Sequence, residues 1–222
     1  MTEEEWFACG DPAALLDASV NLLTDRQLRL FCCACCRHFI GDAKGIYNDL
    51  IEVAEAFADG KVGVQKLHEA TEVARQLRFS PALATAVLWT LADVGWFEDR
   101  VSAWHDILDF VTNSACLASW ENAIISKELL DKERAYQVSL VHDIVGNPFR
   151  PVVIETNWLR SHDELVPKLA RSIYEMRSFT DLPLLADALE EVGCDNNDVL
   201  AHCRAGGEHV RGCWVLDLLR NA

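Results

Sequence analysis

The chain has 222 residues, half of them hydrophobic, which is enough for one large domain or two modest ones with a sizeable core. Its 35 acidic and 20 basic residues give a formal net charge of -15, and no run is rich in lysine or arginine. This charge excludes nucleic acid and anionic membrane surfaces as expected partners, and it favours a basic protein instead.

The first residues and the cysteines indicate the compartment. Glu3, Glu4 and Glu5 stand where a signal peptide needs basic residues, and no apolar run reaches the length that spans a bilayer. The nine cysteines are an odd number, and several fall inside helix-like runs, which suits reduced thiols better than a disulfide framework. We therefore expect a cytoplasmic protein. No pattern in the sequence indicates an oligomeric state.

The first part of the chain predicts short helices with recognisable caps. Thr2 with Glu5, and Thr24 with Gln27, match the capping box, in which two side chains satisfy free N–H groups at a helix start. Asp11 followed by a proline is typical of an N-cap before a helix. The helix after Thr24 carries one apolar stripe at helical spacing, made of Leu28, Phe31, Cys32, Cys35 and Phe39.

The central part predicts further helices, which one clear break ends. They cover residues 46–57, 64–77, 82–92, two segments between 96 and 125, and 128–145. The segment from Asn147 to Pro151 has two prolines within five residues. It cannot be helical, because each proline biases the preceding residue towards extended geometry. Residues 152–154 then form either a short strand or an extended apolar segment.

Four more helices are predicted, over residues 165–177, 182–192, 198–204 and 209–219. Ser161 with Glu164, then Thr180 and Asn197, are the expected caps of the first three, and Gly193 stands where a helix end favours a left-handed residue. The pattern predicts an all-α fold, a multi-helix orthogonal bundle with a short extended segment near residues 151–155. We expect a helical domain of residues 1–146 on which a C-terminal helical segment, residues 147–222, docks, or else one domain of residues 1–222.

Two stretches rich in cysteine and histidine offer unusual chemistry. Cys32, Cys35 and Cys36 stand at i, i+3 and i+4 of one predicted helix, so their sulfurs can converge on a metal, whereas the side chain between them in sequence, Cys33, points about 140° away. In the last predicted helix, His209 and Cys213 form an i, i+4 pair. His202 and Cys203 lie just before the Gly206-Gly207 turn. Thiolate and imidazole are the ligands that zinc prefers, although no complete zinc-knuckle spacing is present.

The same residues can also be explained without a metal. Cys32 and Cys35 share their stripe with large apolar residues and can pack as small hydrophobic side chains. A buried His209 can be satisfied by a carbonyl group, or it can lower the pKa of the Cys213 thiol and produce a reactive thiolate. Three arginines near cysteines either favour a thiolate, cap a helix or pair with carboxylates: Arg37, Arg204 and Arg211.

Several blocks of sequence resemble a family of bacterial proteins with no assigned activity. These blocks are Thr2–Pro12, Leu28–Arg37, Gly146–Pro151, Ala186–Cys194 through His202–Arg204, and His209–Trp214. The resemblance implies that the family pattern includes Cys9, Cys33, Cys35, Cys36, Cys194, His202, Cys203, His209 and Cys213. It implies that Cys32 and Cys116 depart from the pattern, and that the region from about residue 44 to 131 is scaffold.

These patterns lead to one expected site and two candidate functions. The candidate metal ligands, with zinc as the expected ion, are Cys33, Cys35, Cys36, Cys194, His202, Cys203, His209 and Cys213. We expect the two cysteine-rich stretches to meet in the fold. The leading hypothesis is a protein-interaction or regulatory module with a buried cluster that holds a structural metal. The alternative is a thiol- or metal-dependent enzyme, with Cys213 or Cys203 as nucleophile or ligand and His209 as base.

Overall fold

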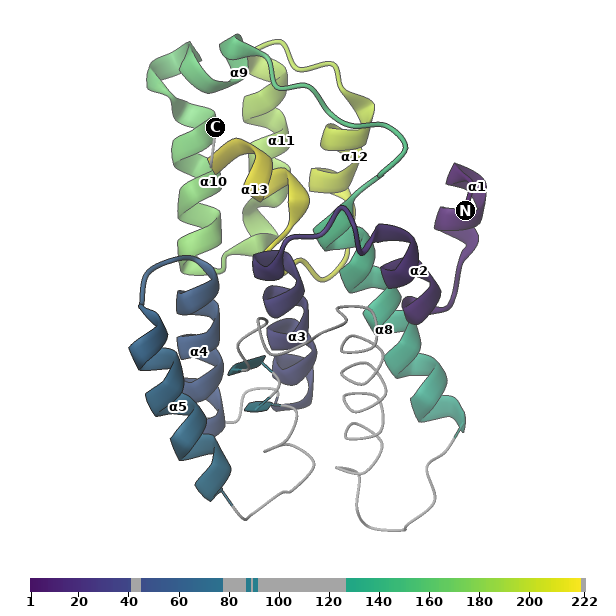
Figure 1. Ribbon diagram of the computed structural model, residues 1–222. Coiled ribbons are helices and arrows are strands. Elements are labelled where there is room, and N and C mark those ends of the chain that lie inside the picture. Colours follow the sequence, from purple (N-terminus) through teal and green to yellow (C-terminus); the bar gives the residue numbers. More distant parts are fainter. Residues whose placement is uncertain (41–44, 78–86, 89, 92–126, 221–222) are drawn as a thin grey trace. The chain divides into compact units, whose positions relative to one another are not determined.

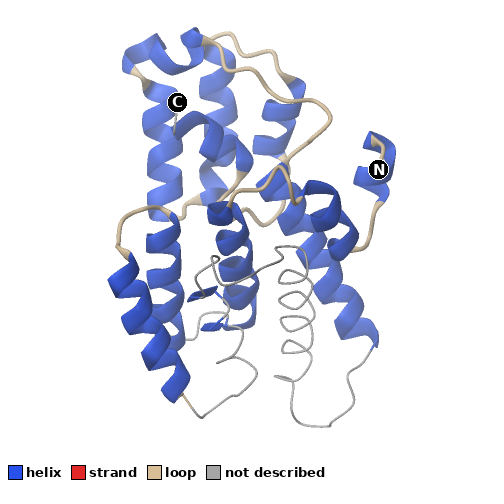
Figure 2. Cartoon of the chain, viewed as in Figure 1, coloured by secondary structure: helices blue, strands red, loops and turns tan. Residues whose placement is uncertain are grey.

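The computed structural model describes residues 1–40, 45–77, 87–88, 90–91 and 127–220 (Figure 1). All the secondary structure in these ranges is helical, and they contain no strand, so the predicted all-α class is confirmed (Figure 2). The predicted helices between residues 92 and 125, Cys116 and most of the predicted 82–92 helix lie outside the described residues. None of the described helices combines the length and the apolar character that crossing a bilayer requires.

The chain divides into two compact units, Glu3–Val141 and His142–Ala222. The division falls inside one helix, α8 (Lys127–Val145), whereas the sequence placed a boundary after residue 146. The two cysteine-rich stretches belong to different units, because α3 (Asp25–Ile40) lies in the first and Cys194, Cys203 and Cys213 lie in the second. That the stretches meet, and that the C-terminal segment docks on the rest, stay predictions.

In the first unit, two helix starts follow predicted caps. Its other helices are α1 (Glu3–Ala8), α2 (Pro12–Ser19), α4 (Ile46–Ala58) and α5 (Val64–Gln76). The Asp11 carboxylate accepts a hydrogen bond from the Ala13 amide at 3.1 Å, as an N-cap does. Thr24 and Gln27 form the reciprocal capping box, with distances of 3.0 and 3.2 Å. Local hydrogen bonding therefore sets both helix starts.

The cysteines of α3 are buried in the first unit. Cys32, Cys33, Cys35 and Cys36 are each at most 2% exposed, so the side chain expected on another face, Cys33, is as buried as the rest. Helix α3 packs against α4, and a partly buried ion pair joins them, because the Arg37 guanidinium donates to both oxygens of the Glu55 carboxylate. Of the three roles that the sequence left open for Arg37, pairing with a carboxylate is the one observed.

The second unit packs five helices around one hydrophobic core. They are α9 (Thr156–Arg160), α10 (Leu165–Met176), α11 (Leu182–Glu191), α12 (Asn197–Arg204) and α13 (Trp214–Arg220). Helix α10 packs against α11 and α13, and α11 packs against α12 (Figure 1). Trp158, Tyr174 and Leu185 are among the fully buried side chains between them. A long loop, tan in Figure 2, leads from α8 to α9 and contains residues 151–155, which form no strand.

Three predicted caps in this unit are wrong, although the helices themselves are present. Glu164 stands at the N-cap of α10 with a left-handed φ of 59° and no side-chain hydrogen bond, so no capping box with Ser161 forms. Helix α11 begins after Asp181 rather than Thr180. Helix α12 is capped by Asn196, whose side chain accepts from two backbone amides, and not by Asn197. A polar residue near a helix start therefore predicts the start only to within one or two residues.

The predicted helix over residues 209–219 is also wrong in its first part. Residues 208–213 form a loop and a turn, and α13 begins only at Trp214. Gly212 has a φ of 97°, which is incompatible with a right-handed helix, and the Val210 amide donates to the Asp143 side chain instead of to a helical carbonyl. His209 and Cys213 are therefore not an i, i+4 pair on a helical face.

Gly146, which follows α8, lies so close to the Trp214 ring that alanine there should cost more stability than alanine at Gly193. Gly146 and Gly193 each follow the end of a helix, and both have a positive φ, 71° for Gly146 and 87° for Gly193. A Cβ at Gly146 would lie 3.0 Å from the Trp214 ring, whereas at Gly193 the nearest atom is 3.5 Å away. We expect Gly193→Ala to lower the free energy of unfolding by about 1 kcal/mol. Gly146→Ala should cost about 1–3 kcal/mol more, measured by urea unfolding. Equal costs would contradict the close packing.

Candidate metal centre

The centre of the candidate site is the carboxylate of Asp143, near the end of α8. Asp143 follows the buried residues Leu140 and Val141 and precedes the buried Ile144, so it lies on the apolar side of the helix end and is 4% exposed. A carboxylate in such a place is stable only when hydrogen-bond donors surround it. The donors come from α12 and from the loop that precedes α13.

Helix α12 supplies the first of them, His202. The helix begins at the Asn196 cap and buries Val199, Leu200 and Cys203, so that His202 lies at the edge of this face with a side chain 16% exposed. Its Nε2 lies 3.2 Å from Asp143 Oδ1 and also 3.2 Å from Cys213 Sγ. One ring nitrogen therefore faces both a carboxylate and a thiol.

The loop between α12 and α13 supplies the other donors. After the exposed Gly206 and Gly207, His209 places Nδ1 2.6 Å from Asp143 Oδ1, and its Nε2 lies 3.4 Å from the Ala205 carbonyl oxygen. The Val210 amide donates to Asp143 Oδ2 at 2.9 Å. Cys213, which is fully buried, closes a turn by donating its amide to the Val210 carbonyl. The carboxylate thus fixes the path of this loop.

Four potential ligand atoms converge here. One atom each from Asp143, His202, His209 and Cys213 lies within 4.8 Å of all the others, and no other group of three or more such residues occurs in the described ranges. The two imidazole rings meet edge to face, with centroids 4.9 Å apart. The set offers one oxygen, two nitrogens and one sulfur, which is the chemistry of a transition-metal site such as zinc rather than of calcium or magnesium.

Burial, hydrogen bonds and neighbouring charges together set the pKa values of Asp143, His209 and Cys213. Burial would raise the pKa of Asp143, but hydrogen bonds and charge from His202 and His209 outweigh it and hold that pKa below its usual value. Burial alone would lower the pKa of His209, yet its hydrogen bond to Asp143 raises it. Burial, followed by the charge of Asp143, raises the pKa of the Cys213 thiol well above the ordinary value. Without a bound cation, Cys213 is therefore a thiol and not a nucleophilic thiolate.

Three of the eight predicted ligands are brought together: His202, His209 and Cys213. Cys194 and Cys203 lie in the same unit but outside the group, and burial raises the pKa of the Cys203 thiol to about 12. The other three predicted ligands, Cys33, Cys35 and Cys36, are buried in α3 of the first unit and are not part of the group. Sequence reasoning missed Asp143, because it resembles any other acidic residue of the amphipathic helix α8.

The arginines of this unit are engaged away from the cluster. Arg204 is paired with Asp187 and Glu190, at 2.9 and 2.7 Å. The guanidinium of Arg211 lies over the Tyr174 ring, 5.4 Å from its centroid. Both contacts are consistent with a structural role for these side chains.

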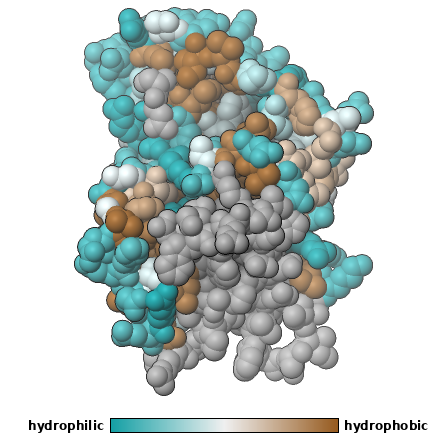
Figure 3. Space-filling model, in the orientation of Figure 1, coloured by the Kyte–Doolittle hydropathy of each residue, from teal (hydrophilic) through white to brown (hydrophobic). Residues whose placement is uncertain are grey.

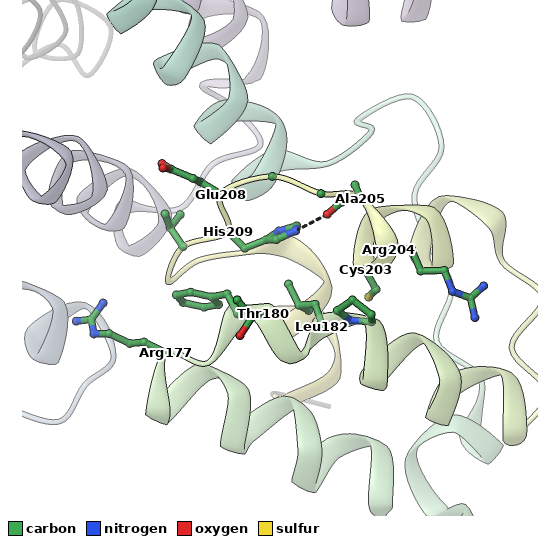
Figure 4. Close-up of a pocket in the computed structure, with 13 residues that line it drawn as sticks. Arg177, Thr180, Leu182, Cys203, Arg204, Ala205, Glu208 and His209 are labelled. Carbon is green, nitrogen blue, oxygen red and sulfur yellow. Dashed lines mark hydrogen bonds between the residues drawn. The ribbon is translucent and has the colours of Figure 1, made fainter. Parts of the chain in front are cut away.

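A pocket of about 480 Å³ adjoins the cluster on one side. Phe179, Leu182 and Val210 give it apolar walls, and His209 and Cys203 also line it. In Figure 4 the His209 ring points towards Ala205, while Arg177 and Arg204 extend away from it. Neither His202 nor Cys213 lines the pocket, so it does not open onto the thiol.

Because the Asp143 carboxylate is buried among hydrogen-bond donors, we expect removal of its charge to cause a large loss of stability. Asp143→Asn keeps the size of the side chain but removes the charge that both imidazoles face. We expect the free energy of unfolding of metal-free protein to fall by about 2–4 kcal/mol in chemical unfolding followed by circular dichroism. Asp187→Asn is the matched control, since Asp187 is 66% exposed and pairs only at the surface, and it should change little. Similar losses for both variants would show that the network contributes nothing special.

The burial of the thiols predicts selective alkylation. Among the described cysteines only Cys9 is partly exposed, and the others are buried. Brief iodoacetamide treatment of folded protein, mapped by mass spectrometry, should label Cys9 and leave Cys203 and Cys213 unmodified. Denatured protein, in which all thiols react, is the control. Labelling of Cys213 as fast as Cys9 would instead indicate an accessible, activated thiol.

Comparisons with known proteins give no indication of a function. No protein-family model, no curated protein and no solved structure matches this chain. The resemblance between its sequence blocks and a bacterial family therefore stays a prediction. The function must be inferred from the chemistry of Asp143, His202, His209 and Cys213.

Proposed function

We propose that the C-terminal unit binds one divalent transition-metal ion, with zinc as the first candidate, through Asp143, His202, His209 and Cys213. The ion has a structural role in a helical module that interacts with, or regulates, a protein partner. The observation that carries the proposal is the convergence of four ligand atoms within 4.8 Å from three separate parts of the unit.

Two of the ligand–ligand distances are close to those of tetrahedral zinc, and the other pairs lie within 4.8 Å, so some of them would have to close by up to about 1 Å. Ligand atoms bound to zinc at about 2.0–2.3 Å are about 3.3–3.7 Å apart. The two distances from His202 Nε2, to Asp143 Oδ1 and to Cys213 Sγ, are both 3.2 Å and need almost no change. His209 Nδ1 and Asp143 Oδ1 are only 2.6 Å apart, so an ion must separate them by less than an ångström, roughly the difference from the tetrahedral edge.

A structural role is favoured over a catalytic one. Four protein ligands complete a tetrahedral zinc site, whereas catalytic sites keep a position open for water or substrate. Cys213 is fully buried and Asp143 nearly so, and neither lines the adjoining pocket. The alternative of an enzyme with Cys213 as nucleophile needs an accessible thiol of lowered pKa, and burial acts against both requirements.

A metal at this position would join the parts of the unit that are weakest alone. Helices α12 and α13 have 8 and 7 residues, too few for stability without tertiary contacts. The four ligands connect the end of α8, α12 and the turn before α13. Free energy of metal binding would therefore become free energy of folding for this region.

The surface of the module supports binding to a protein. Met176 and Leu184 are 75% and 57% exposed, and they are adjacent in sequence to the pocket residues Arg177 and Pro183. Figure 3 shows hydrophobic patches among hydrophilic residues on the face in view. Together with the net charge of -15, these features favour a partner that is basic and carries apolar side chains.

Metal content and its effect on stability test the proposal. Protein purified without an affinity metal should contain about one zinc ion per chain by elemental analysis, and chelation should lower Tm by about 5–10 °C. Cys213→Ser should lose the ion. Cys203→Ser is the matched control, since Cys203 is also fully buried but stands outside the group, and it should keep the ion.

The identity of the ligands is tested with cobalt. Cobalt(II) added to metal-free wild-type protein should give the visible bands of a tetrahedral site and a thiolate charge-transfer band, and Cys213→Ser should lack the latter. Protein that contains no metal, and whose Tm changes neither with zinc nor with a chelator, would overturn the proposal. The cluster would then be only a hydrogen-bonded network.

A further inference from the structure

The ring of Trp214, the first residue of α13, is held on two sides at the edge of the cluster. Its Nε1 donates to His202 Nδ1 at 3.1 Å, and the two rings are tilted by 58° with centroids 5.2 Å apart. The other side of the indole lies against Gly146, where even a Cβ atom would come within 3.0 Å of the ring. This contact fixes the direction of the indole N–H towards His202.

That hydrogen bond determines which nitrogen of neutral His202 carries its proton. An indole N–H can only donate, so His202 Nδ1 must accept with its lone pair. A neutral imidazole then has its single proton on Nε2. Nε2 is the nitrogen that faces Asp143 and Cys213, so the lone pair that a metal needs is occupied by a proton.

The two histidines differ in the group that faces the second ring nitrogen. A metal-binding histidine normally donates its second ring N–H to an acceptor. His209 satisfies this rule, because its Nε2 faces the Ala205 carbonyl oxygen. His202 violates it, because its second nitrogen faces the N–H of Trp214. Both nitrogens that face Asp143 therefore carry a proton in the metal-free protein, and the histidines differ only at the second nitrogen. With a metal on Nδ1, His209 could donate its Nε2–H to the Ala205 carbonyl, whereas with a metal on Nε2, His202 would have to place its Nδ1–H against the N–H of Trp214.

We propose that Trp214 controls metal loading, because its hydrogen bond to His202 and the coordination of a metal by His202 exclude each other. This inference rests on the proposed metal site. When the ion takes the Nε2 lone pair, the ring proton leaves Nε2 and is regained at Nδ1 through solvent, so the imidazole stays neutral. Two N–H groups would then face each other at 3.1 Å, and the indole has to turn away.

Loading of the site is thereby coupled to the start of α13. Trp214 begins this helix, which packs against α10. Displacement of the indole on metal binding would change how α13 begins, and the hydrogen bond restored on metal release would return it. Occupancy of the structural site would thus be linked to the position of α13, in keeping with a module in which the metal shapes the fold.

Trp214→Phe tests the inference, because it removes the N–H and keeps an aromatic ring. The zinc dissociation constant, measured by competition with a chromophoric chelator, should fall about fivefold to tenfold relative to wild type. Trp158→Phe is the matched control. Trp158 is a buried tryptophan of the same unit whose Nε1 has no hydrogen-bond partner, and its substitution should leave the zinc affinity unchanged.

A second measurement uses only the wild-type protein, so it does not depend on the folding of a variant. In ¹⁵N-histidine NMR spectra, His202 should carry its proton on Nε2 in metal-free protein and on Nδ1 after zinc is added. The indole N–H resonance of Trp214 should shift on loading, while that of Trp158 should not. A proton already on Nδ1 without metal would overturn the inference.

The outcomes separate this inference from the proposed function. If wild-type protein binds zinc and folded Trp214→Phe binds it no more tightly, the control by Trp214 is refuted and the metal site stands. If neither protein binds zinc, the proposed function fails and the inference falls with it. Tighter binding by Trp214→Phe, together with the tautomer change in wild type, would support both.

Discussion

A buried carboxylate that must find donors is the constraint on which the second unit depends. Asp143 lies on the apolar side of the end of α8, where an unpaired charge would be very costly. It accepts from the backbone of Val210 and lies beside the rings of His202 and His209. These partners belong to α12 and to the following loop, so the requirement of one side chain fixes the course of the chain from Ala205 to Cys213.

The same carboxylate makes the site more than a group of packed side chains. Cysteines buried without such a partner, as in α3, behave as small hydrophobic residues whose thiols have raised pKa values. Around Asp143, by contrast, the oxygen, nitrogen and sulfur atoms face one centre. What separates the two histidines is the group behind each ring, a carbonyl for His209 and an indole N–H for His202. Ligand identity alone would not distinguish them.

The sequence predicted the presence of the described helices better than their exact starts, because several local cap signals, such as Ser161 with Glu164, do not form. The Asp11 cap and the Thr24–Gln27 box depend on residues within one turn, and both form as expected. His209 and Cys213 were paired for the wrong reason, because helical spacing was assumed where a turn with a left-handed Gly212 brings them together. Asp143 was missed, since its burial depends on helices that follow much later in the chain, and no pattern around it reveals this.

The position of Asp143 also determines where a separately produced fragment of the C-terminal unit has to begin. The prolines after Gly146 offer an obvious place to cut the chain, and a fragment that starts there would contain both histidines and Cys213. It would nevertheless lack the carboxylate, because the second unit begins at His142, inside α8. A fragment that keeps the four-residue cluster therefore has to begin inside α8, before Asp143, and not in the loop that follows this helix.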